Sequence, residues 1–259
     1  MRSLSPPSNL PIPLPVRILT HNIRYATTSP FPNELPWADR KAGLMSELLY
    51  NTRHCPTSLI CLQEVLHSQL LDILEGLNVP EGHAPLPDGQ WSYVGVGRDD
   101  GKTAGEYSPI IYRSDVWRLD SWFTMWLSPT PWMAGSKGWD AASVRIMTAA
   151  KLSHRLAGTT LLATNTHLDD QGNVSRRESA NLIARTIREI LAEDNLDSAF
   201  LAGDLNSEVT GEAYSVLNQE GSRLVDLQRL VDWKRYGDEM TFTGYAASLR
   251  CVSRLLTRW

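Results

Sequence analysis

Residues 159–168 read TTLLATNTHL, and residues 198–205 read SAFLAGDL. Both stretches are short apolar runs that end in polar residues, which is typical of buried strands that reach the surface. Between them, residues 175–193 repeat apolar side chains at helical spacing with Arg and Glu at the other positions. This spacing predicts an amphipathic helix. The sequence therefore predicts strand, helix and strand, with polar residues at both strand ends.

The same reading extends outward in both directions. Mixed connections, some helical and some turn-like, favour an α/β sandwich with partly antiparallel sheets over a purely parallel wound sheet. Predicted strands occupy 16–23, 58–65, 91–97, two runs within 108–127, and 145–153, and predicted helices occupy 40–53, 66–77 and 212–219.

The length of 259 residues fits one domain. Five prolines interrupt residues 1–15, which read as a flexible tail, followed by a domain at 16–245 and an Arg-, Ser- and Leu-rich segment at 246–259. The sequence contains no signal-peptide pattern and no apolar run long enough to span a bilayer, so we expect a cytoplasmic or otherwise intracellular protein.

Charge and cysteine content narrow the function. The formal net charge is −4 without a basic run, so strong binding of duplex DNA is not expected. Three cysteines without a CxxC spacing speak against a disulfide framework and a cysteine-based zinc site. Phosphoester chemistry remains open, because a divalent cation would supply local positive charge.

Four predicted strands end in side chains that can carry chemistry, namely Asn22, Glu64, His167 and Asp204. Acceptors and a histidine at strand ends are what a site at one rim of a sheet requires. Asn206 lies two residues after Asp204, so an extended backbone would aim both side chains the same way. Each residue alone also has an ordinary structural reading: a turn for Gly203–Asn206, a solvated strand end for Glu64, a capped structural histidine for His167.

Taken in order, these pieces resemble the endonuclease/exonuclease/phosphatase family. The matching segments are LTHNIR at 19–24, LQEV at 62–65, GEYSPIIYR at 105–113, TNTHLDD at 164–170, AGDLN at 202–206 and TFTGY at 241–245. The resemblance implies a four-layer α/β/β/α sandwich of two mixed, largely antiparallel sheets with the site at one rim. It implies a Mg²⁺-dependent hydrolase, with Mn²⁺ as a possible substitute.

The resemblance also implies roles for individual residues. Glu64 would be the main magnesium ligand, supported by Asn22. His167 would contact the scissile phosphate. Asp204 would orient or activate the attacking water, and Asn206 would hold phosphate or metal-bound water.

One part of the family pattern is missing. The family closes with an Asp in an R-x-D-Y-like strand and then S-D-H, whereas this sequence has no S-D-H and no histidine after His167. The expectation is a chain truncated before this motif, with C-terminal strands missing and activity impaired, since a lost catalytic base commonly costs about 10²–10⁴-fold in rate.

Two other functions stay open. The first is an inactive relative that binds a phosphorylated ligand or a protein partner. The second is a zinc hydrolase, which would need clustered histidines, although no HxH occurs. Within the hydrolase reading, expected substrates are phosphorylated small molecules, phospholipid head groups or short nucleic acids, and Arg98, Lys102 and Arg113 near the rim are candidate phosphate contacts.

Overall fold

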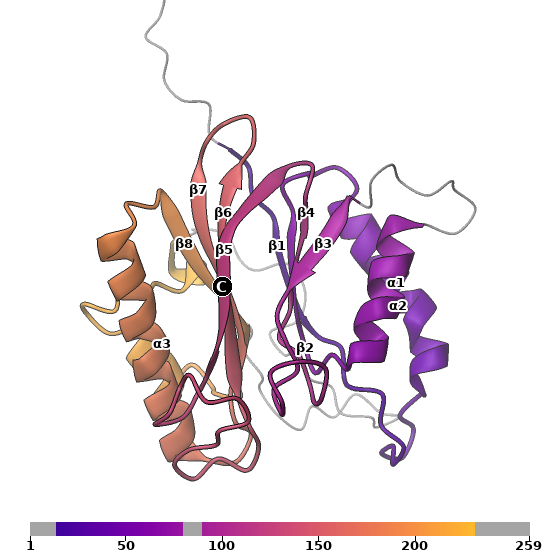
Figure 1. Ribbon diagram of the computed structural model, residues 1–259. Helices are drawn as coiled ribbons and strands as arrows, with labels where there is room; N and C mark the ends of the chain where they lie inside the picture. Colours follow the sequence, from indigo (N-terminus) through magenta and orange to yellow (C-terminus); the bar gives the residue numbers. More distant parts are fainter. Residues whose placement is uncertain (1–13, 80–89, 231–259) are drawn as a thin grey trace, which may run out of the picture.

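The computed structural model describes residues 14–79 and 90–230, which form two four-stranded sheets packed face to face (Figure 1). The first sheet has the strand order β1-β2-β4-β3, with β1 Ile18–Asn22, β2 Leu59–Gln63, β4 Ile110–Arg113 and β3 Trp91–Val94. The second has the order β5-β6-β7-β8, with β5 Trp117–Trp126, β6 Ile146–His154, β7 Thr160–His167 and β8 Ser198–Asp204.

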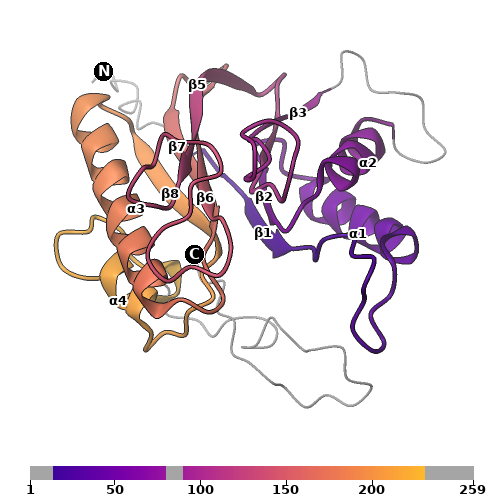
Figure 2. The ribbon, with the colours of Figure 1, turned by 60° about the horizontal axis from the view of Figure 1, so that its bottom comes forward.

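Helices cover the outer face of each sheet (Figures 1 and 2). The first sheet is covered by α1 Trp37–Thr52 and α2 His67–Asn78, and the second by α3 Asn173–Glu193 and the short α4 Glu212–Leu217; a 3₁₀ turn, η1 Leu227–Leu230, follows. The layer order is therefore helix, sheet, sheet, helix, which confirms the predicted α/β sandwich.

Three apolar clusters hold these layers together. One packs α1 and α2 on the first sheet through residues such as Leu48 and Ile73. Another packs α3 and α4 on the second through residues such as Ile183 and Leu217. The third lies between the sheets and includes Cys61, Leu152 and Ala163. Strands of the sandwich interior are buried on both faces, which explains why their sequences read as continuous apolar runs.

Each sheet contains one parallel strand pair, and these pairs position the site. β1 pairs with β2 so that Asn22 lies opposite Gln63, and β7 pairs with β8 so that His167 lies opposite Asp204. The other pairings are antiparallel. The carboxyl ends of a parallel pair meet at one sheet edge, so both pairs deliver their polar ends to the same rim.

The predicted elements match the structure, with shifts at the ends. α3 begins at Asn173, two residues before the predicted start, because Asp140 accepts hydrogen bonds from the backbone N–H of Val174 and Ser175. This cap comes from a distant loop, so sequence spacing could not reveal it. The tail at 1–13, the TFTGY segment, residues 246–259 and the expectation about C-terminal strands lie outside the described residues. No helix within 14–79 or 90–230 is long and apolar enough to cross a membrane.

Candidate active site

Asn22 joins two carboxylates that lie far apart in the sequence. Its Nδ2 donates to Glu64 Oε1 at 2.8 Å and to Asp204 Oδ2 at 3.0 Å. Its Oδ1 accepts from the backbone N–H of Arg24 at 3.0 Å, which fixes the orientation of the amide. The ends of β1, β2 and β8 thus meet around one amide, as the sequence predicted.

Strained backbone accompanies these residues. Arg24, Glu64 and Asn206 have φ values of 58°, 57° and 43°, in the left-handed region that non-glycine residues seldom adopt. Each follows directly or closely on a strand end. Such conformations cost about 1–3 kcal/mol each and persist where surrounding contacts enforce them, often at functional sites.

His167 faces this group from the second sheet. Asn206 Nδ2 lies 3.0 Å from His167 Nε2 and 2.9 Å from the carbonyl oxygen of Leu168, and His167 Nε2 lies 3.8 Å from Asp204 Oδ2. An amide N–H can only donate, so this contact assigns the lone pair to Nε2 and the proton of the neutral ring to Nδ1.

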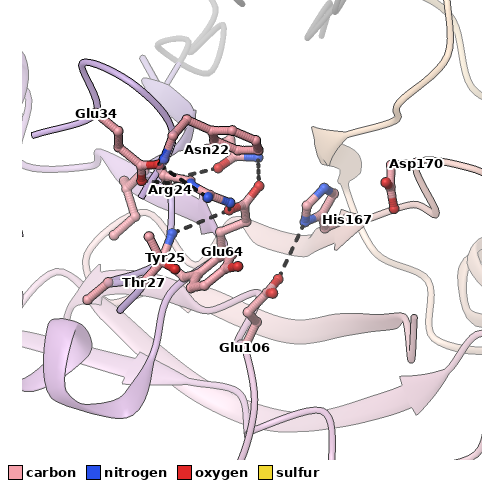
Figure 3. Close-up of polar contacts among 12 residues, drawn as sticks. Asn22, Arg24, Tyr25, Thr27, Glu34, Glu64, Glu106, His167 and Asp170 are labelled. Carbon is pink, nitrogen blue, oxygen red and sulfur yellow. Dashed lines mark hydrogen bonds and ion pairs between the residues drawn. The ribbon is translucent and has the colours of Figure 1, made fainter. Parts of the chain in front are cut away.

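Glu106 completes the histidine's surroundings and was not among the site residues that the sequence predicted. Its Oε2 lies 3.9 Å from His167 Nδ1 (Figure 3), and Arg98 Nη1 donates to the same oxygen at 2.8 Å. His167 Nδ1 is buried without a hydrogen-bond partner among the described residues. Glu106 belongs to the GEYSPIIYR segment, one of the segments that match the family pattern. The sequence does not show that its side chain reaches a strand of the other sheet.

Burial and charge set the protonation of these groups. Burial raises the pKa of Asp204, and the charge of Glu64 adds to the effect. Burial likewise raises the pKa of Glu106, against the opposing charge of Arg98. The pKa of His167 lies well below its ordinary value because burial and the nearby Arg145 and Arg98 disfavour the imidazolium. The site therefore holds a neutral imidazole beside carboxylates whose ionised forms are penalised.

A buried amide pair joins the sheets beneath the site. Gln63 Nε2 donates to Asn165 Oδ1 at 2.8 Å, and Asn165 Nδ2 donates to the carbonyl oxygens of Leu62 and Pro109, both at 2.8 Å. Three hydrogen bonds engage both polar atoms of the buried Asn165 amide, and such buried bonds favour a single arrangement of their strands. This bridge therefore sets the separation between Glu64 on one sheet and His167 on the other.

Asp169 is buried, two residues after His167. Its carboxylate accepts from the N–H groups of Ala142, Ser143, Gln171 and Gly172 and from Arg145 Nε. Burial would raise the pKa of Asp169, but these donors hold it far below the ordinary value. The turn reading of Asp169 holds for Gln171 and Gly172, and the carboxylate also ties in the distant 142–145 segment.

The three predicted rim cations separate in the structure. Arg98 lies at the site, where it donates a hydrogen bond to Glu106. Lys102 is exposed on the neighbouring loop. Arg113 is at the far end of β4 from the rim, where it pairs with Asp115 and Gln90, so its assignment as a rim residue was wrong. β4 runs antiparallel to β2, which ends at the rim, and the sequence alone did not fix that direction.

The donor set fits Mg²⁺. Within 14–79 and 90–230, no three His, Cys, Asp or Glu residues cluster closely enough to hold a metal by themselves. Mg²⁺ does not need such a cage, because one or two carboxylates, water and substrate phosphate oxygens commonly complete its shell. Glu64 and Asp204 could supply hard oxygen ligands, and a divalent cation would offset the penalty that burial and, to a lesser extent, the charge of Glu64 place on ionised Asp204.

Comparisons with known proteins agree with this fold. The endonuclease/exonuclease/phosphatase from Bacteroides vulgatus is 36% identical with a TM-score of 0.66, and the match covers 79% of this chain and 71% of that chain. The mannosyl-6-phosphatase from Bacteroides thetaiotaomicron is 32% identical with a TM-score of 0.68, over 79% and 70% of the two chains. The human Nocturnin catalytic domain shares the fold at 16% identity, with a TM-score of 0.60 and coverage of 82% and 72%.

A scan of family models found no match to this sequence, and a search of curated proteins found none either. The relatives above 30% identity support a phosphoester hydrolase in general. The structural relatives above 30% identity show that the chain belongs to the endonuclease/exonuclease/phosphatase family.

Proposed function

We propose that this protein hydrolyses phosphoesters with the help of a divalent cation, Mg²⁺ or Mn²⁺, bound at Glu64 and supported by Asn22. The observation that carries the proposal is the single amide of Asn22 that bridges Glu64 and Asp204 opposite His167. Two carboxylates held together at a rim, beside a neutral imidazole, suit a cation and a phosphate side by side.

The bound cation would neutralise charge on the phosphate oxygens and polarise the phosphorus toward attack. Asp204 would orient the attacking water and accept its proton, which its raised pKa favours. As a neutral ring that accepts from Asn206 at Nε2, His167 would donate from Nδ1 to a phosphate oxygen, with the nearby Glu106 orienting the ring. Asn206 would hold His167 in place through Nε2.

The test is an assay of the purified chain on a phosphomonoester and a phosphodiester, each with Mg²⁺, Mn²⁺ or EDTA. Glu64→Gln and Asp204→Asn are the site variants, and the exposed Glu189→Gln is the matched control. Turnover that needs the metal and is lost in both site variants supports the proposal. Turnover that survives EDTA, or that Glu64→Gln retains in full, would refute it.

The substrate proposal follows from the relatives. One relative above 30% identity is a mannosyl-6-phosphatase, so a hexose 6-phosphate is the first monoester to assay. Phospholipid head groups and short oligonucleotides follow, while duplex DNA is disfavoured by the net charge of −4. A tenfold preference in kcat/KM for one class assigns it.

We further propose that the 259-residue chain turns over slowly. Its sequence holds no S-D-H and no histidine after His167, so a second His–carboxylate base is not supplied from that part of the pattern. Asp204 would then act as the base alone, at a cost of about 10²–10⁴-fold in rate.

The same observation favours a second candidate, a protein that binds a phosphorylated ligand without hydrolysing it. Calorimetry with hexose 6-phosphate separates the two. Saturable binding without product formation over days assigns the binding role, whereas metal-dependent product formation at any rate above the Asp204→Asn background assigns the hydrolase.

A further inference from the structure

A further carboxylate, Glu34, is linked to the predicted metal ligand Glu64 through Arg24. Glu34 precedes α1, and its side chain is 1% exposed. Arg24 Nε donates to Glu34 Oε1 at 2.9 Å and Arg24 Nη2 to Glu34 Oε2 at 3.3 Å, so the two side chains form a bidentate pair. Phe31 N–H donates to Glu34 Oε2 at 2.9 Å, which anchors the carboxylate to its own turn.

Arg24 also faces Glu64, at a longer distance. Its Nη1 lies 3.6 Å from Glu64 Oε2, beyond the range of a good N–H···O bond (Figure 3). The guanidinium stacks over Tyr25, 4.3 Å from the ring centroid, and lies 5.0 Å from that of Phe31. The two rings and Glu34 thus hold the guanidinium beside Glu64 without a close contact.

We infer that Glu34 is a positioning residue that holds the Arg24 guanidinium off Glu64 and so keeps Glu64 free to bind the cation. The inference rests on the proposed function, since it takes Glu64 as the metal ligand. Arg24 and the cation compete for one carboxylate, and Glu34 decides that competition by offering Arg24 a buried, bidentate alternative.

Charge and geometry both support this assignment. The hydrogen bond and charge of Arg24 hold the pKa of Glu34 below its ordinary value, so Glu34 is ionised and neutralises Arg24 at neutral pH. Arg24 Nη1 needs to move by less than about 1 Å to reach normal hydrogen-bond distance from Glu64. With Glu34 neutral, the partly buried guanidinium would lose its bidentate ion pair, and it would gain by closing on Glu64, the carboxylate that it already faces.

The experiment measures Mg²⁺ binding by titration calorimetry, so it does not depend on turnover. Glu34→Gln keeps the shape of the side chain and removes its charge. Its Mg²⁺ affinity should fall by roughly tenfold or more, in line with changes to residues that support metal ligands. Arg24→Gln should bind Mg²⁺ at least as tightly as the wild-type protein, and the double variant Arg24→Gln/Glu34→Gln should return to within about threefold of it.

Glu47→Gln, which changes a half-exposed carboxylate on α1, is the matched control and should bind normally. Thermal melts establish that each variant is folded. If Glu34→Gln does not fold, the single variant Arg24→Gln still decides, because a guanidinium that merely holds Glu64 in place would give weaker Mg²⁺ binding when removed.

Three results would overturn the inference: unchanged Mg²⁺ affinity in folded Glu34→Gln, a double variant as weak as Glu34→Gln alone, or weaker Mg²⁺ binding by Arg24→Gln. A failure of the proposed function looks different. In that case the wild-type protein does not bind Mg²⁺, or it binds Mg²⁺ equally well after Glu64→Ala. The Glu34 and Arg24 variants would then have no binding at Glu64 to change.

Discussion

His167 and Glu106 face each other across the two sheets, with Nδ1 of the ring 3.9 Å from Oε2 of the carboxylate. The ring nitrogen is buried and has no hydrogen-bond partner in the described part of the chain, and the carboxylate oxygen is already engaged by Arg98. A small closing movement would turn this contact into a hydrogen bond, as catalytic contacts often tighten when a ligand binds. The pair therefore links the protonation of Glu106 to the orientation of His167.

Glu106→Gln should lower kcat by about 10²-fold with a smaller change in KM, because an amide orients the ring less firmly than a carboxylate. The pH profile gives a second readout. Burial raises the pKa of Glu106, so its useful ionised form is lost as pH falls through that raised value, at a higher pH than for an ordinary glutamate. Both Glu106 and the proposed base Asp204 should contribute to the acidic limb of the wild-type profile, and Glu106→Gln should leave only the contribution of Asp204. A variant with an unchanged limb would contradict the role of Glu106.

The ionised carboxylate of Asp204 should destabilise the folded state. The pKa of this carboxyl is raised above its model-compound value of 3.8 by burial. The folded state therefore binds the proton more tightly than the unfolded state, and stability falls as pH rises from about that value through the raised pKa. Asp204→Asn removes the penalty and should raise the melting temperature at pH 7 in EDTA by about 2–4 °C.

The gain from Asp204→Asn should vanish below the unfolded pKa, where both proteins are neutral at this position. It should also shrink in saturating Mg²⁺, because a cation that binds the folded wild-type protein stabilises it by mass action. A melting temperature that is lower than that of the wild-type protein at every pH would show that the hydrogen bonds from Asn22 and Asn206 outweigh the charge.

The strand-end residues could be predicted because the local sequence pattern marks where each strand ends, and these strand ends meet at one rim. Apolar runs that end in Asn22, Glu64, His167 and Asp204 belong to two parallel pairs, and parallel strands deliver their ends to one rim. Contacts between sheets could not be predicted in this way. Glu106, Gln63 and Asn165 act across the sandwich, and only the packing of one sheet on the other brings them together.

The same limit applies to Asp169. Sequence spacing explains its bonds to Gln171 and Gly172, because Asp commonly accepts from the backbone of the following residues. Its bonds to Ala142, Ser143 and Arg145 depend on where a loop of the second sheet returns, and local pattern carries no information about that.

Asp169→Asn should destabilise the protein by about 3–5 kcal/mol, because it leaves the buried Arg145 without its full counter-charge. The lowered pKa adds a pH dependence: this stabilisation is present above the unfolded pKa and declines as pH falls toward the folded one. Urea unfolding at pH 7 and at pH values below 3.8, the ordinary pKa of an Asp, measures both. The matched control is Asp170→Asn, which removes a half-exposed partner of the same arginine and should cost about 0–1 kcal/mol. Equal losses in the two variants would refute the assignment.

The residue before Asp204 is Gly203, and the structure leaves no room for a side chain at this position. Its φ is +144°, and a Cβ placed there would lie 2.1 Å from the carbonyl oxygen of Thr166 on β7. Backbone on both sides leaves nothing flexible to move, so Gly203→Ala should spread the β7–β8 pair beside His167 and Asp204. We expect a loss of stability above about 3 kcal/mol, or no soluble protein, since overpacking against backbone cannot relax.

Gly43→Ala on α1 is the control: no atom lies within 4 Å of its Cβ position, and the change should stabilise the helix by about 0.5–1 kcal/mol. Chemical denaturation of both variants measures the contrast. A Gly203→Ala protein as stable as the wild type would mean that the strand pair at the rim is looser than the structure shows.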